Sequence, residues 1–326
     1  MGESGVFCAG FARTKYPTPH LFEKIQTGLS MQYEVQASNR VGRLLNRLPI
    51  LGDVLRQPLG AIGFAIVLIF VITVIFAPLI APYNYARQDI PNRLQGPSAQ
   101  YLLGTDHLGR DLFSRLVYGS RIAFATAIPS VGVALVAGIL LGLIAGYVGG
   151  FVDNLIVIAM DSLQAFPAIM LSLAILALLG PSLVNVIIVI GITWMPNYAR
   201  VIRAQVFSAR EKMYVEAERS LGATDRVILL SHILPNVIAP VLLLATMDLP
   251  WVITFEAGLS FLGLGVPPPN PSWGVILSEG FDFIFQSPWP ILWSGVTLIL
   301  TTLGFTLFGE ALRDVLDPRL SGTRGF

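Results

Sequence analysis

Long apolar segments alternate with shorter polar ones along this chain of 326 residues. The first, residues 59–81, holds 23 positions without a charge. As a helix such a segment measures about 34 Å, which exceeds the roughly 30 Å of a hydrocarbon core. The pattern recurs five times, so we expect an all-α integral membrane protein with six transmembrane helices. The other predicted spans are 122–147, 155–179, 183–199, 236–258 and 291–309.

The composition also favours a bilayer. Hydrophobic residues make up 54% of the chain, charged residues only 13%, and the mean hydropathy is +0.70. Soluble domains carry about 25% charged residues. The net charge of +1 gives no reason to expect nucleic acid as a partner. The single cysteine, Cys8, excludes an intramolecular disulfide and a multi-cysteine metal site.

The distribution of basic residues predicts the orientation. Of the 21 lysines and arginines, 16 lie in the amino-terminal tail, the 200–235 loop and the carboxyl tail, and the other 5 lie between Arg87 and Arg121. Cytoplasmic loops collect Lys and Arg. We therefore expect both termini and the 200–235 loop in the cytoplasm.

Five regions follow from this topology. Residues 1–58 form a cytoplasmic tail without the apolar core of a signal peptide, and residues 1–30 are expected to be disordered. The other regions are a first transmembrane helix at 59–81, an extracytoplasmic segment at 82–120, a transmembrane core at 121–311 with the cytoplasmic coupling loop 200–235, and a cytoplasmic tail at 312–326.

Two stretches lie on the outer side in this topology. Residues 104–111 concentrate Gly, Thr and Asp, which is typical of a turn that caps the next helix; a rim contact with a binding protein is the alternative. Residues 260–290 lack Lys and Arg and are rich in Pro, Gly and aromatics. We expect them to form a re-entrant or interfacial cover, with Trp273, Trp289 and Trp293 near the headgroups.

A charged island, residues 216–240, separates the fourth and fifth spans. Met213, Ala217 and Leu221 form an apolar stripe at helical spacing, with charged residues on the other side, so a short amphipathic helix is expected. Gly222 can adopt the left-handed conformation that ends a helix, and a second helix follows. The island therefore predicts a rigid elbow on the membrane surface.

This elbow resembles the EAA loop of the permease subunits of ATP-binding-cassette importers, which inserts into a groove on the partner ATPase. The residues that carry the resemblance are Glu216, Ala217, Gly222, Ile233, Leu234, Pro235 and Pro240. Three further stretches, 103–122, 256–274 and 312–320, look like those of the peptide and nickel importer permeases, in particular the second of their two permease subunits. One departure is Glu218, where the family usually has a second alanine.

The resemblance implies a type I importer permease fold in a bacterial cytoplasmic (inner) membrane, surrounded by lipid. It implies four further subunits: a paralogous permease as heterodimer partner, two ATPases and an extracytoplasmic substrate-binding protein. ATP and Mg would bind in the ATPases, and this chain would bind no cofactor. The implied cargo is a di- or oligopeptide, with nickel or another small solute as the alternative within the family.

The elbow would couple ATP hydrolysis to the pore. We assign polar contacts beside the ATPase groove to Glu216, close approach to Ala217 and the turn to Gly222. The remaining predicted residues of the coupling loop are Glu218, Arg219, Ile233, Leu234 and Pro235. The alternative is a surface helix that only covers lipid headgroups.

Ionisable residues inside spans are costly and are therefore candidates for function. Asp248, near the middle of the fifth span, is the main pore candidate, and a buried pairing with another helix is the alternative. Asp161 and Glu256 lie nearer span ends, where bonds to helix termini are the alternative. Asp161 has no basic residue beside it in the sequence, and Pro167 allows a kink in that span.

Gly138, Gly142 and Gly146 recur at every fourth position of the second span. Three glycines on one helix face let another backbone approach closely. This pattern predicts a helix–helix contact and not a ligand site.

The sequence carries no chemistry of its own. It lacks a GxxxxGK[ST] phosphate loop, an HExxH motif and a GxSxG motif, so we expect neither an enzyme nor a metal site. An ion-coupled secondary transporter is the rival from another class. Such a transporter should show inverted repeats and broken helices around a midplane site, and no repeat is evident.

Overall fold

The computed structural model describes residues 47–316, so the disorder expected for residues 1–30 falls outside the described residues. The chain divides into two units, residues 1–52 and 53–326. Helix α2 (Arg47–Arg56) is the first described element. Between residues 47 and 316 the regular secondary structure is helical, apart from one isolated bridge between Thr105 and Asp111. The prediction of an all-α protein is thus confirmed.

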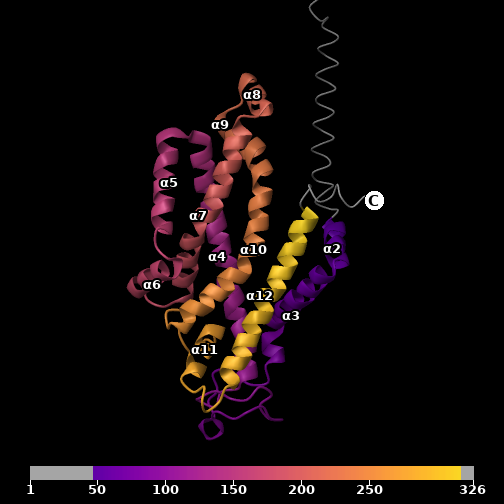
Figure 1. Cartoon of the computed structure of the whole chain (residues 1–326), viewed down its shortest axis with the longest axis vertical. Helices are drawn as coiled ribbons and strands as arrows, with labels where there is room; N and C mark the ends of the chain where they lie inside the picture. Colours follow the sequence, from indigo (N-terminus) through magenta and orange to yellow (C-terminus); the bar gives the residue numbers. More distant parts are fainter. Residues whose placement is uncertain (1–46, 317–326) are drawn as a thin grey trace, which may run out of the picture. The chain divides into compact units, whose positions relative to one another are not determined.

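Five helical runs are long and apolar enough to cross a membrane (Figure 1). They are α3 (Pro58–Ile80), α4 (Leu112–Val148), α7 (Leu183–Arg210), the continuous run Asp225–Phe261 and α12 (Trp289–Leu316). A sixth span is present if α5 (Gly150–Gln164) and α6 (Ala168–Leu179) are counted together, although they are bent by 89°. The structure therefore supports five to six spans.

The shorter elements lie between these spans. The first is the 3₁₀ turn η1 (Ile90–Asn92), and the last is α11 (Trp273–Phe281), which packs on α10 and α12. Between α7 and α10 come α8 (Met213–Ser220), α9 (Asp225–Val227) and the π-helical stretch η2 (Ile228–Ile233), which leads directly into α10 (Leu234–Phe261). From here on, the elbow means residues 211–233. The end of the bundle that carries the elbow is called the elbow end, and the opposite end is called the loop end.

Three span boundaries differ from the prediction. Helix α4 begins at Leu112, well before residue 122, because the Asp111 carboxylate caps it by accepting from the Ser114 N–H at 2.8 Å. Helix α7 continues to Arg210 and α12 to Leu316, beyond the apolar runs that hydropathy detects. The helices thus extend past the apolar core into polar surroundings.

The third predicted span is broken and not merely kinked. Helix α5 ends at Gln164, and α6 starts after Pro167. Proline has no N–H to give to a helix and disfavours the helical conformation of the residue before it, here Phe166. Gly180, with φ +83°, then ends α6.

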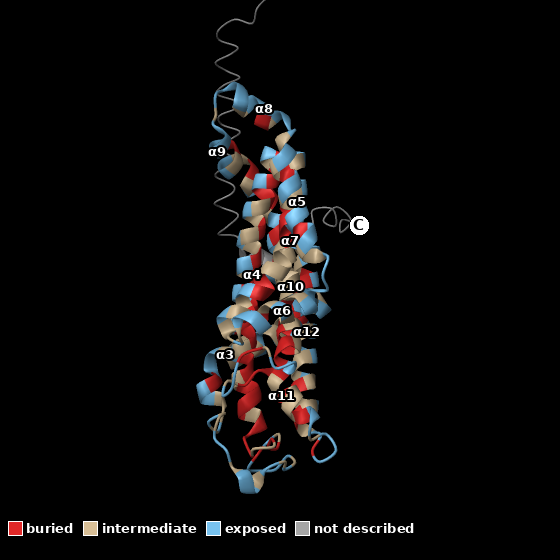
Figure 2. Cartoon of the chain, turned by 90° about the vertical axis from the view of Figure 1, so that its left-hand side faces the viewer, coloured by how far each residue is buried: buried red, intermediate tan, exposed pale blue. Residues whose placement is uncertain are grey.

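Helix α4 is the centre of the bundle. It packs along α7 and also contacts α10 and α3, while α12 lies against α3 and α10 (Figure 1). Buried residues line these contacts, whereas the outward faces of the long helices stay exposed (Figure 2). Many of those exposed residues are large and apolar, such as Ile69, Leu140 and Ile299. An apolar exterior of this kind suits lipid.

The three glycines of α4 face α7. A Cβ added at Gly138 would lie 2.6 Å from Tyr198 Cβ, and one at Gly142 would lie 2.5 Å from the Ala199 carbonyl oxygen. At Gly146 the nearest atom would be the Arg203 carbonyl oxygen at 2.8 Å. The partner of the glycine face is therefore α7, and only glycine permits this separation of the two backbones.

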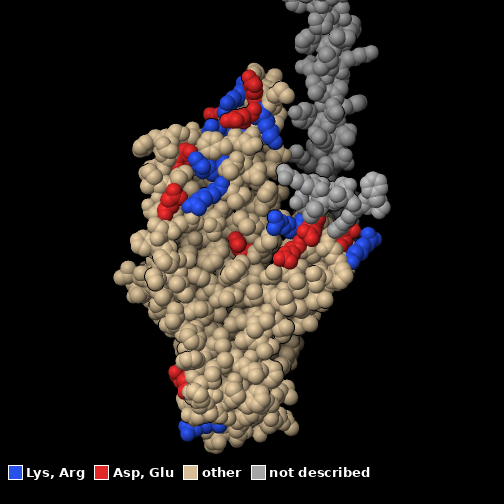
Figure 3. Space-filling model, viewed as in Figure 1, with Lys and Arg blue, Asp and Glu red and all other residues tan. Residues whose placement is uncertain are grey.

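Charged side chains are unevenly distributed. On the face drawn in Figure 3 they gather at the elbow end, over α8 and the adjoining ends of α5 and α7, and near the end of α12. A few lie at the loop end, and a broad uncharged band separates the two groups (Figure 3). Such a band is expected for the part of a protein that faces hydrocarbon.

The position predicted for Trp273 is wrong. Its side chain is 1% exposed, and its indole N–H donates to the Leu116 carbonyl at 3.0 Å. Trp273 thus anchors α11 to α4 inside the bundle, and its side chain is not available to headgroups. Trp289 and Trp293 are half-buried and stacked, with ring centroids 6.3 Å apart.

Candidate functional site

The elbow makes a sharp turn at the tip of the bundle. Helix α8 stops at Ser220, Gly222 takes a φ of +83°, and the chain returns through α9 and η2 into α10 (Figure 1). The Gly222 N–H donates to the Arg219 carbonyl at 3.0 Å, which closes the turn. A residue with a side chain would be strained at this φ, so the sequence folds into a turn here because it has glycine.

The apolar stripe of α8 faces outward. Val215 is fully buried and holds α8 on the bundle, while Met213 is 86% and Leu221 83% exposed. Ala217 and Glu216 are exposed as well, and most of α8 has the colour of exposed residues in Figure 2. The stripe therefore projects away from this chain. Exposed apolar residues beside a small one form a surface suited to contact with another protein.

The remaining predicted coupling residues divide into two groups. Arg219 and Pro235 are exposed, whereas Ile233 is buried and Leu234 half-buried against the core. Glu218, the departure from the family pattern, points toward η2, with its Oε1 3.3 Å from His232 Nε2. Its extra length is thus accommodated inside the elbow and does not project beside Ala217.

A phenol at the end of α4 holds the elbow in place. The Tyr147 hydroxyl donates to Asp225 Oδ1, and Arg219 Nη2 donates to the same hydroxyl at 3.5 Å. The Arg219 guanidinium also lies 5.8 Å from the Tyr147 ring centroid. Sequence reasoning missed this contact, because Tyr147 lies 78 positions before Asp225 and neither residue carries a motif.

The three predicted pore carboxylates lie in different surroundings. Asp248 is beside Tyr198, where α10 meets α7, and its Oδ2 is buried without a hydrogen-bond partner among the described residues. Glu256 is 1% exposed and accepts from Ser260 at 2.6 Å and from Ser272, the cap of α11, at 3.0 Å. The structure thus brings none of these carboxylates together.

Asp161 has no basic residue beside it in the sequence, but the fold supplies one from another helix. Arg200, from α7, donates to Asp161 Oδ1 at 2.7 Å. Nearer the elbow end, Arg203 donates to both oxygens of Asp153, with the Nη2–Oδ2 distance at 2.7 Å. Two ion pairs therefore join α5 to α7. The sequence separations of 39 and 50 residues hide both pairs from local inspection.

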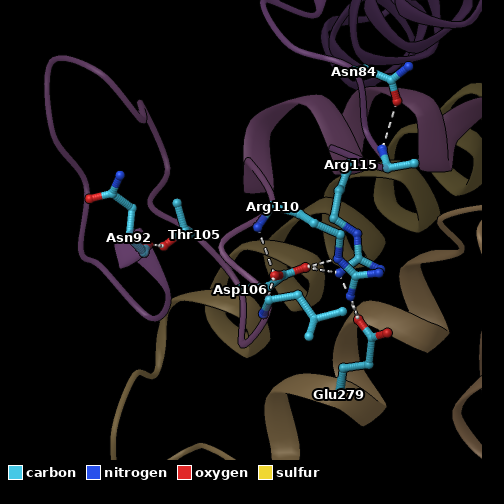
Figure 4. Close-up of polar contacts among 9 residues, drawn as sticks. Asn84, Asn92, Thr105, Asp106, Arg110, Arg115 and Glu279 are labelled. Atoms are coloured by element: carbon cyan, nitrogen blue, oxygen red, sulfur yellow. Dashed lines mark hydrogen bonds and ion pairs between the residues drawn. The ribbon is translucent and has the colours of Figure 1, made fainter. Parts of the chain in front are cut away.

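The loop end contains a buried ion cluster that the sequence did not reveal. Asp106 accepts from Arg110 Nε at 2.6 Å and also from Arg115, and both arginines donate to Glu279 on α11, at 2.8 and 2.7 Å (Figure 4). We call these four residues the loop cluster. It ties the 81–111 segment, α4 and α11 together, and so Asp106 serves as an ion partner and not as a helix cap.

Electrostatics explains how the loop cluster stays charged. Burial raises the pKa of Asp106. Arg115, Arg110 and the backbone N–H groups of Arg110 and Leu108 lower that pKa by more than burial raises it, so it lies below its ordinary value of 3.8. His107 also places a ring nitrogen within 4.8 Å of ligand atoms of Asp106 and Glu279. The arginines already neutralise both carboxylates, which leaves little attraction for a cation.

Comparison with known proteins agrees with this architecture. Residues 138–322 match the family model "Binding-protein-dependent transport system inner membrane component", and residues 53–97 match "N-terminal TM domain of oligopeptide transport permease C". The dipeptide transport system permease protein DppC of Alkalihalophilus pseudofirmus is 43% identical over 81% of this chain and 87% of its own length.

Two further relatives are similar over the same extent. The di/tripeptide transport system permease protein DppC of Pseudomonas aeruginosa is 41% identical over 80% of this chain and 88% of its own. The glutathione transport system permease protein GsiD of Escherichia coli is 40% identical over 82% and 88%. The chain therefore belongs to the binding-protein-dependent transport system inner membrane components, multi-pass permease subunits of ATP-binding-cassette importers that are not enzymes and rely on partner ATPases for ATP hydrolysis.

Proposed function

We propose that this chain forms half of the translocation pore for di- or oligopeptides and couples that pore to ATPase subunits through its elbow. The observation that carries the proposal is the exposed tip, where Met213, Ala217 and Leu221 project from the bundle. Apolar side chains presented on a short helix fit a groove on a partner protein. The relatives named for dipeptide, di/tripeptide and glutathione transport support a peptide as cargo.

The proposed assembly has five subunits. A paralogous permease completes the pore, two ATPases bind ATP and Mg at the elbow end, and a substrate-binding protein delivers peptide at the loop end. With 16 of 21 basic residues in the tails and the 200–235 loop, the elbow end faces the cytoplasm and both termini lie inside. ATP binding then shifts the pore between its states because the elbow is held differently in each.

The test is ATP-dependent uptake of a labelled dipeptide into vesicles that contain the whole complex. The elbow variant combines Glu216→Lys with Gly222→Ala, and the control combines Glu310→Lys, at an exposed position of α12, with Gly150→Ala. Both glycines have positive φ, +83° and +57°, and at neither does a Cβ meet another atom within 4 Å. The two variants thus introduce the same charge change and a similar backbone strain, on and off the elbow tip.

We expect the elbow variant to lose at least about tenfold in uptake, which corresponds to 1.4 kcal/mol of coupling, while the control stays within about twofold of the native chain. The ATPases should also copurify less well with the elbow variant. Equal uptake by the two variants would show that the tip does not dock the ATPase. Uptake of nickel in place of dipeptide by the native complex would redirect the cargo assignment and leave the coupling result intact.

A further inference from the structure

The break between α5 and α6 lies at the depth of the spans. It faces Asn197 at the middle of α7, because Gln164 Nε2 donates to Asn197 Oδ1 at 2.8 Å. Phe166, inside the break, is 61% exposed. Non-helical backbone at this depth is tolerated only where protein covers it or where it lines a water-filled cavity. This face of the chain is therefore not a lipid-facing surface in the working complex.

Polar side chains follow one face of α7 past this break. Thr193, Asn197 and Arg200 are spaced by four and three residues, so they share a face. Asp161 and Gln164 on α5 meet them, and the side chains of the Asp161–Arg200 pair remain 57% and 48% exposed. Ionisable groups at membrane depth face bundle interiors or water-filled cavities. The stripe thus marks a wet surface.

A cleft opens beside the stripe. Its volume is about 300 Å³, and its lining includes Gln164, Phe166, Thr193, Trp194 and Asn197. The walls combine two carboxamides and a hydroxyl with two aromatic rings. The Asp161–Arg200 pair lies one turn from the carboxamides, toward the elbow end.

We propose that this cleft, with the Asp161–Arg200 pair at its rim, contacts the main chain of a short peptide as it crosses the membrane. The inference rests on the proposed function. Carboxamides both donate and accept, which matches successive peptide N–H and C=O groups. The carboxylate and guanidinium of the rim match the ammonium and carboxylate ends of a zwitterion. Phe166 and Trp194 offer apolar contact without selecting one side chain.

The side chains that line the cleft favour weak, transient contact with a peptide over tight binding. Each carboxamide, hydroxyl and charged side chain of the cleft and its rim already has at least one partner in this chain: Gln164 pairs with Asn197, Asp161 with Arg200, and Thr193 with the Val189 carbonyl at 2.8 Å. A peptide that replaces one pairing gains only the difference between two similar bonds. The site would therefore recognise any short peptide weakly and release it.

The single cysteine makes a direct test possible. In the whole complex, Cys8→Ser gives a thiol-free parent chain, into which Asn197→Cys or the control Ile69→Cys is introduced. Ile69 is 61% exposed on the apolar face of α3. The probe is a charged, water-soluble methanethiosulfonate, which reacts with thiolates in water and hardly in lipid. We expect Asn197→Cys to react at least about tenfold faster than Ile69→Cys, and excess dialanine to slow the reaction severalfold.

Uptake of labelled dialanine provides the second readout. Asn197→Leu should lower uptake by about fivefold or more, whereas Ile69→Leu should leave it unchanged. Reaction of Asn197→Cys no faster than that of Ile69→Cys would overturn the proposal, since the partner permease or lipid would then cover the cleft. A reaction rate of Asn197→Cys that excess dialanine does not change would also overturn the proposal. If the Cys8→Ser parent itself takes up no dipeptide, the peptide assignment of the chain and of the cleft fails together, while the rate ratio still decides whether the cleft holds water.

Discussion

The two ends of the bundle use similar polar groups for opposite purposes. At the loop end, Asp106 and Arg115 are 2% and 1% exposed, and they pair inside the loop cluster. At the elbow end, Tyr147, Arg219 and Asp225 make a comparable network, but Arg219 and Asp225 are exposed. The difference is burial. It makes one network an anchor of the fold and the other a contact that water can replace.

Energetics explains why each network suits its place. Removing one partner from a buried ion pair leaves an uncompensated charge away from water, whereas exposed pairs contribute little because water and salt screen them. The loop cluster therefore fixes the 81–111 segment and α11 on α4. The elbow contact is weak enough to break or re-form as partner subunits move.

The largest effect is expected from Asp106→Asn. The substitution leaves Arg110 and Arg115 buried with only Glu279 to neutralise them, so the free energy of unfolding should fall by about 3–5 kcal/mol. The measurement is the midpoint of thermal unfolding in detergent. The matched control is Asp53→Asn, whose partner Arg56 has an 84% exposed side chain, and there the change should be close to zero. Equal shifts for both variants would refute the distinction between the networks.

Sequence reasoning found what depends on neighbours along the chain. Apolar runs predicted the spans, and the glycine turn at Gly222 followed from residue type alone. Pairings between distant segments were out of reach: Arg115 lies 164 positions from Glu279, and nothing local says which helices meet. The orientation of α8 could not be predicted either, for a different reason. An apolar stripe shows which side of a helix avoids water, and in a subunit that docks a partner this side can face away from its own chain.

An intermediate effect is expected from acid. The pKa of Asp106 lies below its ordinary value of 3.8 in the folded chain, so its charge adds stability at higher pH, and this stability is lost as pH falls through the folded pKa. The unfolding midpoint should stay level from neutral pH to about pH 5 and drop below about pH 4, whereas Asp106→Asn should show a shallower acid limb. Parallel acid limbs would assign the loss to other carboxylates.

The smallest effect on stability, with a distinct effect on function, is expected from Tyr147→Phe. It removes one hydroxyl that bonds Asp225 and Arg219 and keeps the ring, so the unfolding free energy should change by about 1 kcal/mol or less. The elbow would lose its contact with the end of α4, and ATP-dependent dipeptide uptake should fall about threefold. Tyr85→Phe is the control, since Tyr85 lies in the 81–111 segment at the loop end, where its ring centroid is 4.7 Å from that of Tyr118 and far from the elbow. If both variants transport equally, the elbow does not depend on Tyr147, and the exposed network is only a surface contact. If Tyr147→Phe instead unfolds as readily as Asp106→Asn, burial does not separate the two ends.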